Sequence, residues 1–238
     1  MRIALLDKLT GEWAKPWIII WFTAGVAALF TTFWRTTEHA GLDWFYFGVS
    51  IIGLICVAAL SFRRNIAGNG FGMAATAGES YVQWTAGSVG LMLTPIYNFF
   101  THLYGLYYWS KNTDGDGNMI PKSANKWIWL VTIAFIVVGL LFFNTINAKM
   151  AELGILPTTD DKFYWLNVAA FVVAITAQTT MILRYSLSWW LWLLSNFIWL
   201  FVNLMSENYI FAIQTLVYQV NAVIGLYEWY RSESQHNA

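Results

Sequence analysis

The sequence predicts an all-α integral membrane protein with eight transmembrane helices. Apolar residues make up 58% of the 238 positions and charged residues only 11%, whereas about a quarter of a soluble domain is charged. Uncharged apolar runs such as 17–34 and 127–143 approach the roughly 20 residues that cross a bilayer as a helix. Tryptophan and tyrosine stand at many ends of these runs, as in the interfacial belts of membrane helices.

Charged and turn-forming residues divide the chain into eight segments, because both kinds of residue are costly inside hydrocarbon. The predicted helices cover residues 17–34, 44–62, 68–84, 89–109, 127–143, 163–183, 188–205 and 209–230. The third helix is rich in glycine, in the run GNGFG from Gly68 to Gly72 and again at Gly78. Glycine lets membrane helices approach one another, so these positions predict close helix packing.

The distribution of lysine and arginine predicts the orientation. An even number of helices brings both termini to one side of the membrane. That side then holds Arg2, Lys8, Lys15, Arg63, Arg64, Lys111, Lys122, Lys126, Arg184 and Arg231. The other side holds Arg35, Lys149 and Lys162. Since cytoplasmic loops carry the excess of positive charge, we expect both termini in the cytoplasm and the protein in a bacterial inner membrane.

An internal repeat organises most of the chain. The segment GLYYWSK (105–111) recurs 120 residues later as GLYEWYR (225–231), and the same shift lays helices two to four on helices six to eight. The helix 127–143 joins these three-helix repeats and makes them run in the same direction, as in a transporter with its solute site between the halves. The predicted regions are an N-terminal part with an extra helix (1–42), the first repeat (43–111), a loop and linker helix (112–162), the second repeat (163–231) and a cytoplasmic tail (232–238).

Polar side chains inside spanning helices usually face the bundle interior or a water-filled path. Steps of three and four residues place two such sets on single helix faces. The first set is Trp189, Trp192, Asn196, Trp199 and Asn203, and the second is Gln214, Tyr218, Asn221 and Gly225. The 120-residue shift maps these faces onto Thr76, Glu79 and Gln83, and onto Thr94, Asn98, Thr101 and Gly105. Both halves therefore direct a polar stripe at the same place.

The residue types in these stripes indicate the chemistry of a solute. Indole and phenol rings stack on a flat ring and attract a cation, and amides pair with a carboxamide or with hydroxyl groups. The implied solute is a planar ring, cationic or neutral, with a polar appendage. The alternative is that the amides only bond neighbouring helices. The candidate substrate-binding residues are Trp189, Trp192, Asn196, Trp199, Gln214, Tyr218, Asn221, Glu79, Gln83 and Asn98.

Glu79 is the one carboxylate that this segmentation places inside a helix. It is suited to offset a cationic solute or to relay a proton, and the alternatives are a bond between helices or a place near the outer surface. His102 has no second histidine three or four residues away, so we expect it to bond a neighbouring helix rather than a metal or haem. Ser88 lies too far along the same helix to pair with it for hydrolysis. We predict no catalytic residue, metal or cofactor.

The segment 114–125 begins like a calcium-binding loop. Met119 stands where such a loop needs glycine, and Asn125 stands where it needs glutamate. We therefore expect a solvated turn there. The formal net charge is zero, which argues against a nucleic-acid partner.

Two motifs carry a family resemblance. The first is WxxWxxxN, at Trp189, Trp192 and Asn196, and the second is NxxxGLYxW, from Asn221 to Trp229. Together with two three-helix repeats joined by one helix, they resemble the PnuC-type vitamin transporters over helices two to eight. The resemblance implies a fold similar to that of the SWEET sugar transporters, a homotrimer, and facilitated diffusion of nicotinamide riboside for NAD biosynthesis. Thiamine, which is also a flat cation, or another related vitamin is the alternative solute.

Overall fold

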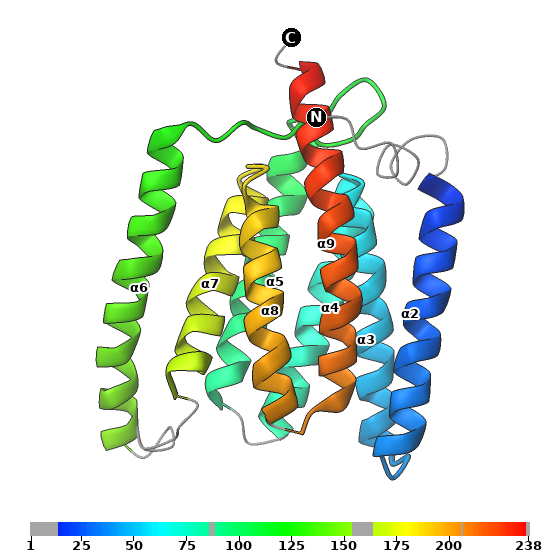
Figure 1. Cartoon of the computed structure of the whole chain (residues 1–238), viewed down its shortest axis with the longest axis vertical. Helices are drawn as coiled ribbons and strands as arrows, with labels where there is room; N and C mark the ends of the chain where they lie inside the picture. Colours follow the sequence, from blue (N-terminus) through cyan, green and yellow to red (C-terminus); the bar gives the residue numbers. More distant parts are fainter. Residues whose placement is uncertain (1–13, 86–88, 154–163, 206, 237–238) are drawn as a thin grey trace.

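The computed structural model describes residues 14–85, 89–153, 164–205 and 207–236 (Figure 1). Within these residues the chain forms eight helices, as predicted. They are α2 (Ala14–Thr36), α3 (Gly41–Ser61), α4 (Asn65–Thr85), α5 (Val89–Ser110), α6 (Lys126–Glu152), α7 (Tyr164–Ile182), α8 (Ser188–Met205) and α9 (Tyr209–His236).

Several helices extend beyond their predicted ends. The helix α4 begins at Asn65 instead of Gly68, α6 continues to Glu152 instead of residue 143, and α9 continues to His236 instead of residue 230. Charged side chains limit the part of a helix that lies in hydrocarbon, but the backbone hydrogen bonds can continue past it into the polar region. Residues 232–236, predicted as a tail, are accordingly helical.

Five of the described helices are long and apolar enough to cross a membrane by length and composition. These spans are Pro16–Thr36, Gly41–Ser61, Lys126–Phe143, Ser188–Met205 and Tyr209–Gln235. The helix α7 contains a shorter apolar stretch, Val168–Ile182. The helix α4 is less apolar because it carries buried polar residues such as Asn69 and Thr76 on its inner side.

Six helices form two three-helix units, one of α3, α4 and α5 and the other of α7, α8 and α9. Within each unit, helices that follow one another in the chain pack together. The units meet where α3 packs on α9 and where α5 packs on α7. The helix α2 lies against α3 and α9, and α6 lies against α7, so these two helices stand at opposite edges of the bundle (Figure 1).

A buried tryptophan joins the end of each unit to the other unit. The indole N–H of Trp109 donates to the carbonyl of Ile182 at 2.9 Å, and that of Trp229 donates to the carbonyl of Leu60 at 3.0 Å. The two rings meet edge to face, with centroids 5.7 Å apart. These tryptophans are 120 residues apart in the sequence, so their matching contacts agree with the proposed repeat.

The loop between α5 and α6 crosses the end of the bundle at which both units end. The N–H of Met119 donates to the carbonyl of Arg63 at 3.0 Å, and the N–H of Lys122 donates to the carbonyl of Arg184 at 2.6 Å. Residues 115–117 are exposed, as expected of a solvated turn. That expectation is wrong for Met119, whose side chain is fully buried with the two tryptophans. An apolar side chain in a polar loop gains by returning to the core.

Close packing at glycine is confirmed for two of the three glycines in GNGFG. A Cβ atom on Gly72 would come within 2.5 Å of the His102 ring, and one on Gly68 would come within 2.7 Å of Leu60. The prediction is wrong for Gly70, which has open space where a Cβ would stand. Residues two positions apart lie on roughly opposite sides of a helix, so Gly70 faces away from the side that Gly68 and Gly72 share.

Candidate functional site

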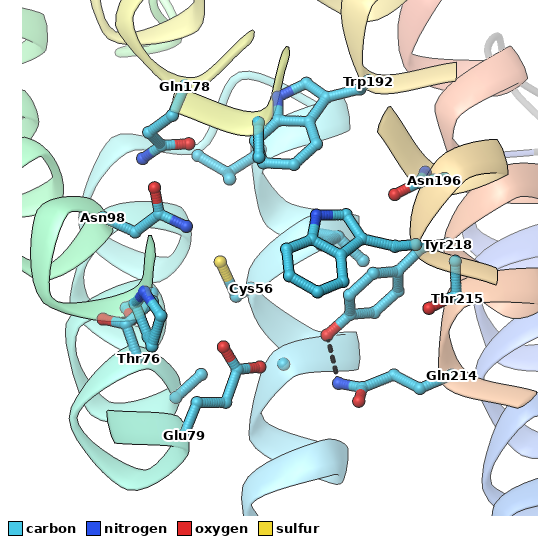
Figure 2. Close-up of a pocket in the computed structure, with 18 of the residues that line it drawn as sticks. Cys56, Thr76, Glu79, Asn98, Gln178, Trp192, Asn196, Gln214, Thr215 and Tyr218 are labelled. Carbon is cyan, nitrogen blue, oxygen red and sulfur yellow. Dashed lines mark hydrogen bonds between the residues drawn. The ribbon is translucent and has the colours of Figure 1, made fainter. Parts of the chain in front are cut away.

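A cavity of about 190 Å³ lies inside the bundle, between the two three-helix units (Figure 2). All six helices of the two units contribute to its wall. One ordered water needs only about 10–15 Å³. The cavity therefore has room for a small organic molecule.

Nine of the ten predicted site residues line this cavity. They are Trp189, Trp192, Asn196, Trp199, Gln214, Tyr218, Asn221, Glu79 and Asn98. The tenth, Gln83, belongs to α4, but its side chain lies outside the described residues. The remaining stripe residues Asn203, Thr76 and Thr94 also line the cavity, whereas Thr101, Gly105 and Gly225 do not.

The aromatic part of the wall comes from α8 and α9. Trp189 is held against Trp229 edge to face, with centroids 5.6 Å apart. Gly225 makes room for it, because a Cβ atom there would come within 2.5 Å of the Trp189 ring. The indole N–H groups of Trp189 and Trp192 are buried, and neither has a hydrogen-bond partner among the described residues. Buried donors of this kind suit the acceptors of a solute or of bound water.

The opposite part of the wall, from α4 and α5, supplies polar groups. Within the described part of the chain, the Asn98 side-chain oxygen and the Thr94 hydroxyl are buried without a hydrogen-bond partner. In Figure 2 the amide of Asn98 lies across the cavity from that of Asn196. Amides on two facing walls can bond both ends of a small polar molecule.

Two of the predicted amides already have partners in the protein. The Gln214 amide N–H donates to the Tyr218 hydroxyl at 2.5 Å. The Asn221 amide N–H donates to the carbonyl of Val57 at 3.0 Å and to the hydroxyl of Ser61 at 2.6 Å. Asn221 therefore joins α9 to α3, which is the structural alternative considered for these amides. A single helical face does not reveal this, because a face shows where a side chain points and not what it meets.

Glu79 lines the cavity and has no hydrogen-bond or ion-pair partner among the described residues. Its carboxyl group lies beside Cys56 and Tyr218 in Figure 2. Neither the outer surface nor a bond to another helix describes this position. The described wall contains no lysine, arginine or aspartate, and Glu79 is its one carboxylic side chain.

Gln178 lines the cavity from α7 but belongs to neither of the polar stripes predicted from the sequence. Its amide nitrogen lies 3.1 Å from the Thr101 hydroxyl oxygen and 3.3 Å from Nε2 of His102. His102 also lies 3.0 Å from the side-chain oxygen of Asn69, so its predicted role in bonding neighbouring helices is confirmed. The cost of an amide in a spanning helix could have identified Gln178. The repeat did not, since its counterpart under the 120-residue shift is Ala58.

A bundle of membrane-spanning helices with a cavity between two helical units, lined by apolar and aromatic side chains and a few polar groups, is the architecture of a multi-pass membrane transport protein. Residues 43–231 match the family model described as nicotinamide mononucleotide transporter, and the chain belongs to this family. It is a transporter and not an enzyme.

A curated relative and a solved structure agree with this assignment. The nicotinamide riboside transporter PnuC of Haemophilus influenzae is 26% identical over 229 residues, which cover 94% of each chain. The crystal structure of the vitamin B3 transporter PnuC superposes with a TM-score of 0.74 and 20% identity, covering 92% of each chain. The resemblance to PnuC-type transporters is thus confirmed, and the fold is theirs.

Proposed function

We propose that this protein carries nicotinamide riboside across the membrane by facilitated diffusion and so supplies NAD biosynthesis. The observation that carries the proposal is the composition of the cavity wall, which combines indole rings and amides from α8 and α9 with the amide of Asn98 and the carboxyl group of Glu79 from the other unit. Nicotinamide riboside has a cationic ring that suits indole faces and Glu79. Its carboxamide and ribose suit the amides.

The wall favours the nucleoside over the nucleotide for which the family model is described. A phosphate group is bound most strongly by lysine or arginine, whose charge offsets the cost of removing it from water. The described wall contains no lysine or arginine, and the carboxylate of Glu79 would repel a phosphate. The relative from Haemophilus influenzae is likewise named for the riboside.

Passive transport is supported by the scarcity of ionisable groups along the cavity. Coupling to protons generally uses carboxylates and histidines connected in a relay. The carboxyl group of Glu79 is hydrogen-bonded to no described residue, and the described wall has no second carboxyl group. The histidine of the wall, His102, is bonded to Asn69 and Gln178 and not to Glu79, so the two groups form no relay. We therefore expect no accumulation of unmodified solute against its gradient.

The proposal includes an inner-membrane location with both termini in the cytoplasm. In Figure 1 the start of α2 and the end of α9 lie at the same end of the bundle, together with the loop between α5 and α6. Arg63, Lys122 and Arg184 lie at this end, where the loop between α5 and α6 bonds the backbone of Arg63 and Arg184. Arg35 lies in the last turn of α2, at the other end. The excess of cations supports a cytoplasmic assignment for the first end. The homotrimer is proposed from the family resemblance, and mass photometry in detergent would test it.

Calorimetric titration of the purified protein with nicotinamide riboside, nicotinamide mononucleotide and thiamine tests the substrate. We expect the riboside to bind most tightly. Uptake of the riboside into protein-bearing liposomes should follow its gradient and be unaffected by an uncoupler. Preference for thiamine would move the assignment to that vitamin, and preference for the mononucleotide would contradict the argument from the missing cation.

A further inference from the structure

A chain of buried hydrogen bonds leads from the cavity through α5 into α4. The amide nitrogen of Gln178 lies 3.3 Å from Nε2 of His102, and Nδ1 of His102 lies 3.0 Å from the side-chain oxygen of Asn69. The amide nitrogen of Asn69 donates to the side-chain oxygen of Asn65 at 2.8 Å. The amide nitrogen of Asn65 donates to the carbonyl of Leu106 at 3.0 Å.

The far end of this chain determines the direction of every bond in it. A backbone carbonyl only accepts, so Asn65 turns its N–H₂ group to Leu106 and its oxygen to Asn69. Asn69 then donates to Asn65 and keeps its own oxygen for His102. Nδ1 of His102 must carry the proton, and Nε2 of the neutral ring is left as an acceptor. Gln178 must therefore present its N–H₂ group to His102.

A second bond holds the same amide from α5. The N–H₂ group of Gln178 also donates to the Thr101 hydroxyl at 3.1 Å, and that hydroxyl donates to the backbone carbonyl of Asn98 at 2.8 Å. Both amide hydrogens of Gln178 are thus engaged. Its carbonyl oxygen accepts from no described residue and is turned toward the middle of the cavity in Figure 2. This oxygen is an oriented acceptor that needs a donor, in addition to the side-chain oxygen of Asn98.

We propose that the carbonyl of Gln178 accepts a hydrogen bond from the carboxamide N–H₂ of the solute, and that His102 and Asn69 are positioning residues for it. This inference rests on the proposed function, since the solute must carry a primary carboxamide. If the bond to His102 were lost, only the Thr101 hydroxyl would hold the Gln178 amide. Because a hydroxyl can either accept or donate, the amide could then rotate by 180° and offer a donor to the cavity instead. The network therefore selects a ring that bears a carboxamide over the same ring without one.

The test compares the affinities of nicotinamide riboside and N-ribosylpyridinium, which lacks the carboxamide, by calorimetric titration. Wild-type protein should prefer nicotinamide riboside by at least roughly tenfold, as expected for one buried hydrogen bond. His102→Leu should reduce this preference about tenfold by weakening the riboside alone. His102→Gln should keep it, because a glutamine there can accept from Gln178 and donate to Asn69. A general folding defect would weaken both ligands equally.

Thr176→Val is a matched control on α7. Its hydroxyl is buried and donates to its own helix, to the carbonyl of Val172 at 2.7 Å, and it does not line the cavity. This variant should keep the wild-type preference. In a Gln178→Leu background, His102→Leu should have no further effect on the preference, because the group that His102 positions is already absent.

An unchanged preference in folded His102→Leu protein would overturn the inference. If that variant does not fold, ¹⁵N NMR of wild-type protein decides, since a His102 ring protonated at Nε2 instead of Nδ1 contradicts the direction of the bonds. If wild-type protein bound nicotinamide riboside and N-ribosylpyridinium with nearly equal affinity, the inference would be overturned and the proposed function would stand. Binding of thiamine but of neither pyridinium compound would overturn both.

Discussion

The two three-helix units share a scaffold but present different side chains to the cavity. A Cβ atom on Gly105 would come within 2.6 Å of Asn69, and one on Gly225 would come within 2.5 Å of Trp189. Gly105 and Gly225 are 120 residues apart, and so are the residues that they contact, Asn69 and Trp189. At equivalent positions, a glycine therefore packs against an amide in the first unit and against an indole ring in the second.

The cavity wall shows the same contrast at equivalent positions. Seven pairs of residues 120 apart both line it, and four of them are polar or aromatic at both positions: Thr76 and Asn196, Glu79 and Trp199, Thr94 and Gln214, and Asn98 and Tyr218. The first unit supplies hydroxyls, an amide and a carboxyl group, and the second supplies most of the rings and most of the amides. A ring with a polar appendage has unlike ends and faces, so two identical walls could not complement it. Two units that pack alike but present different side chains to the cavity are suited to an asymmetric solute.

The largest expected effect tests the shared scaffold. Trp109→Ala and Trp229→Ala should each destabilise the protein by about 3–5 kcal/mol, because each removes a fully buried ring. Thermal or denaturant unfolding in detergent measures the loss. Trp127→Ala should cost little, since Trp127 is 63% exposed at the start of α6. A large loss for one buried tryptophan and a small loss for the other would show that the two units are not equivalent.

The next effect tests the unequal lining. Asn196→Leu and Trp192→Ala should each weaken riboside binding by roughly tenfold to a hundredfold while the protein still folds, through a lost hydrogen bond and lost ring stacking. Asn221→Leu should instead mainly lower stability, because the Asn221 amide holds α3. Calorimetry and unfolding on the same samples separate these outcomes. Wild-type affinity in a folded Asn196→Leu sample would show that this stripe serves helix packing only.

A smaller effect distinguishes Glu79 from its counterpart Trp199. Glu79→Gln should weaken the cationic riboside roughly tenfold, or about 1.4 kcal/mol. The same change should leave benzamide riboside, its neutral isostere, nearly unaffected, because the carboxylate acts through charge. Trp199→Leu should weaken both ligands, since stacking depends less on charge. Equal losses for the two ligands in Glu79→Gln would remove the electrostatic role.

The smallest effect concerns the loop that closes one end of the bundle. Burial raises the pKa of Asp114, but the N–H groups of Asn118 and Asp116 and the guanidinium of Arg63 outweigh it and lower the pKa below its ordinary value. A lowered pKa stabilises the fold above the unfolded value of about 3.9, and this contribution is lost as the pH falls through the folded pKa. Asp114→Asn should therefore cost at most about 1 kcal/mol at pH 7.

This cost should disappear at acidic pH, when Asp114 is protonated in the wild type as well. Arg184 provides the comparison, because its guanidinium donates to the carbonyl of Ile120 at 2.8 Å, a partner that does not titrate. Unfolding midpoints of wild type, Asp114→Asn and Arg184→Gln between about pH 3 and pH 7 measure both. If Asp114→Asn lost the same stability at both ends of this pH range, the loss would come from packing and not from the charge of Asp114.

Much of the bundle is predictable because its causes are local in the sequence. The length of an apolar run sets a spanning helix, and steps of three and four residues set the face on which Trp192, Asn196 and Glu79 lie. Helix ends were less predictable, as α6 and α9 show, because a helix can continue after its apolar stretch has ended.

The sequence by itself determined that the chain spans a membrane, how many helices it forms and which side chains face inward, since hydropathy and helical period are properties of neighbouring residues. Only the tertiary structure decided what each inward side chain meets. The amide of Asn221 bonds α3, and Glu79 has no hydrogen-bond partner among the described residues. Gln178 belongs to a chain of hydrogen bonds that runs through His102. The physical reason is that a hydrogen bond depends on two atoms about 3 Å apart, and residues as distant as 102 and 178 reach that separation only when the helices pack.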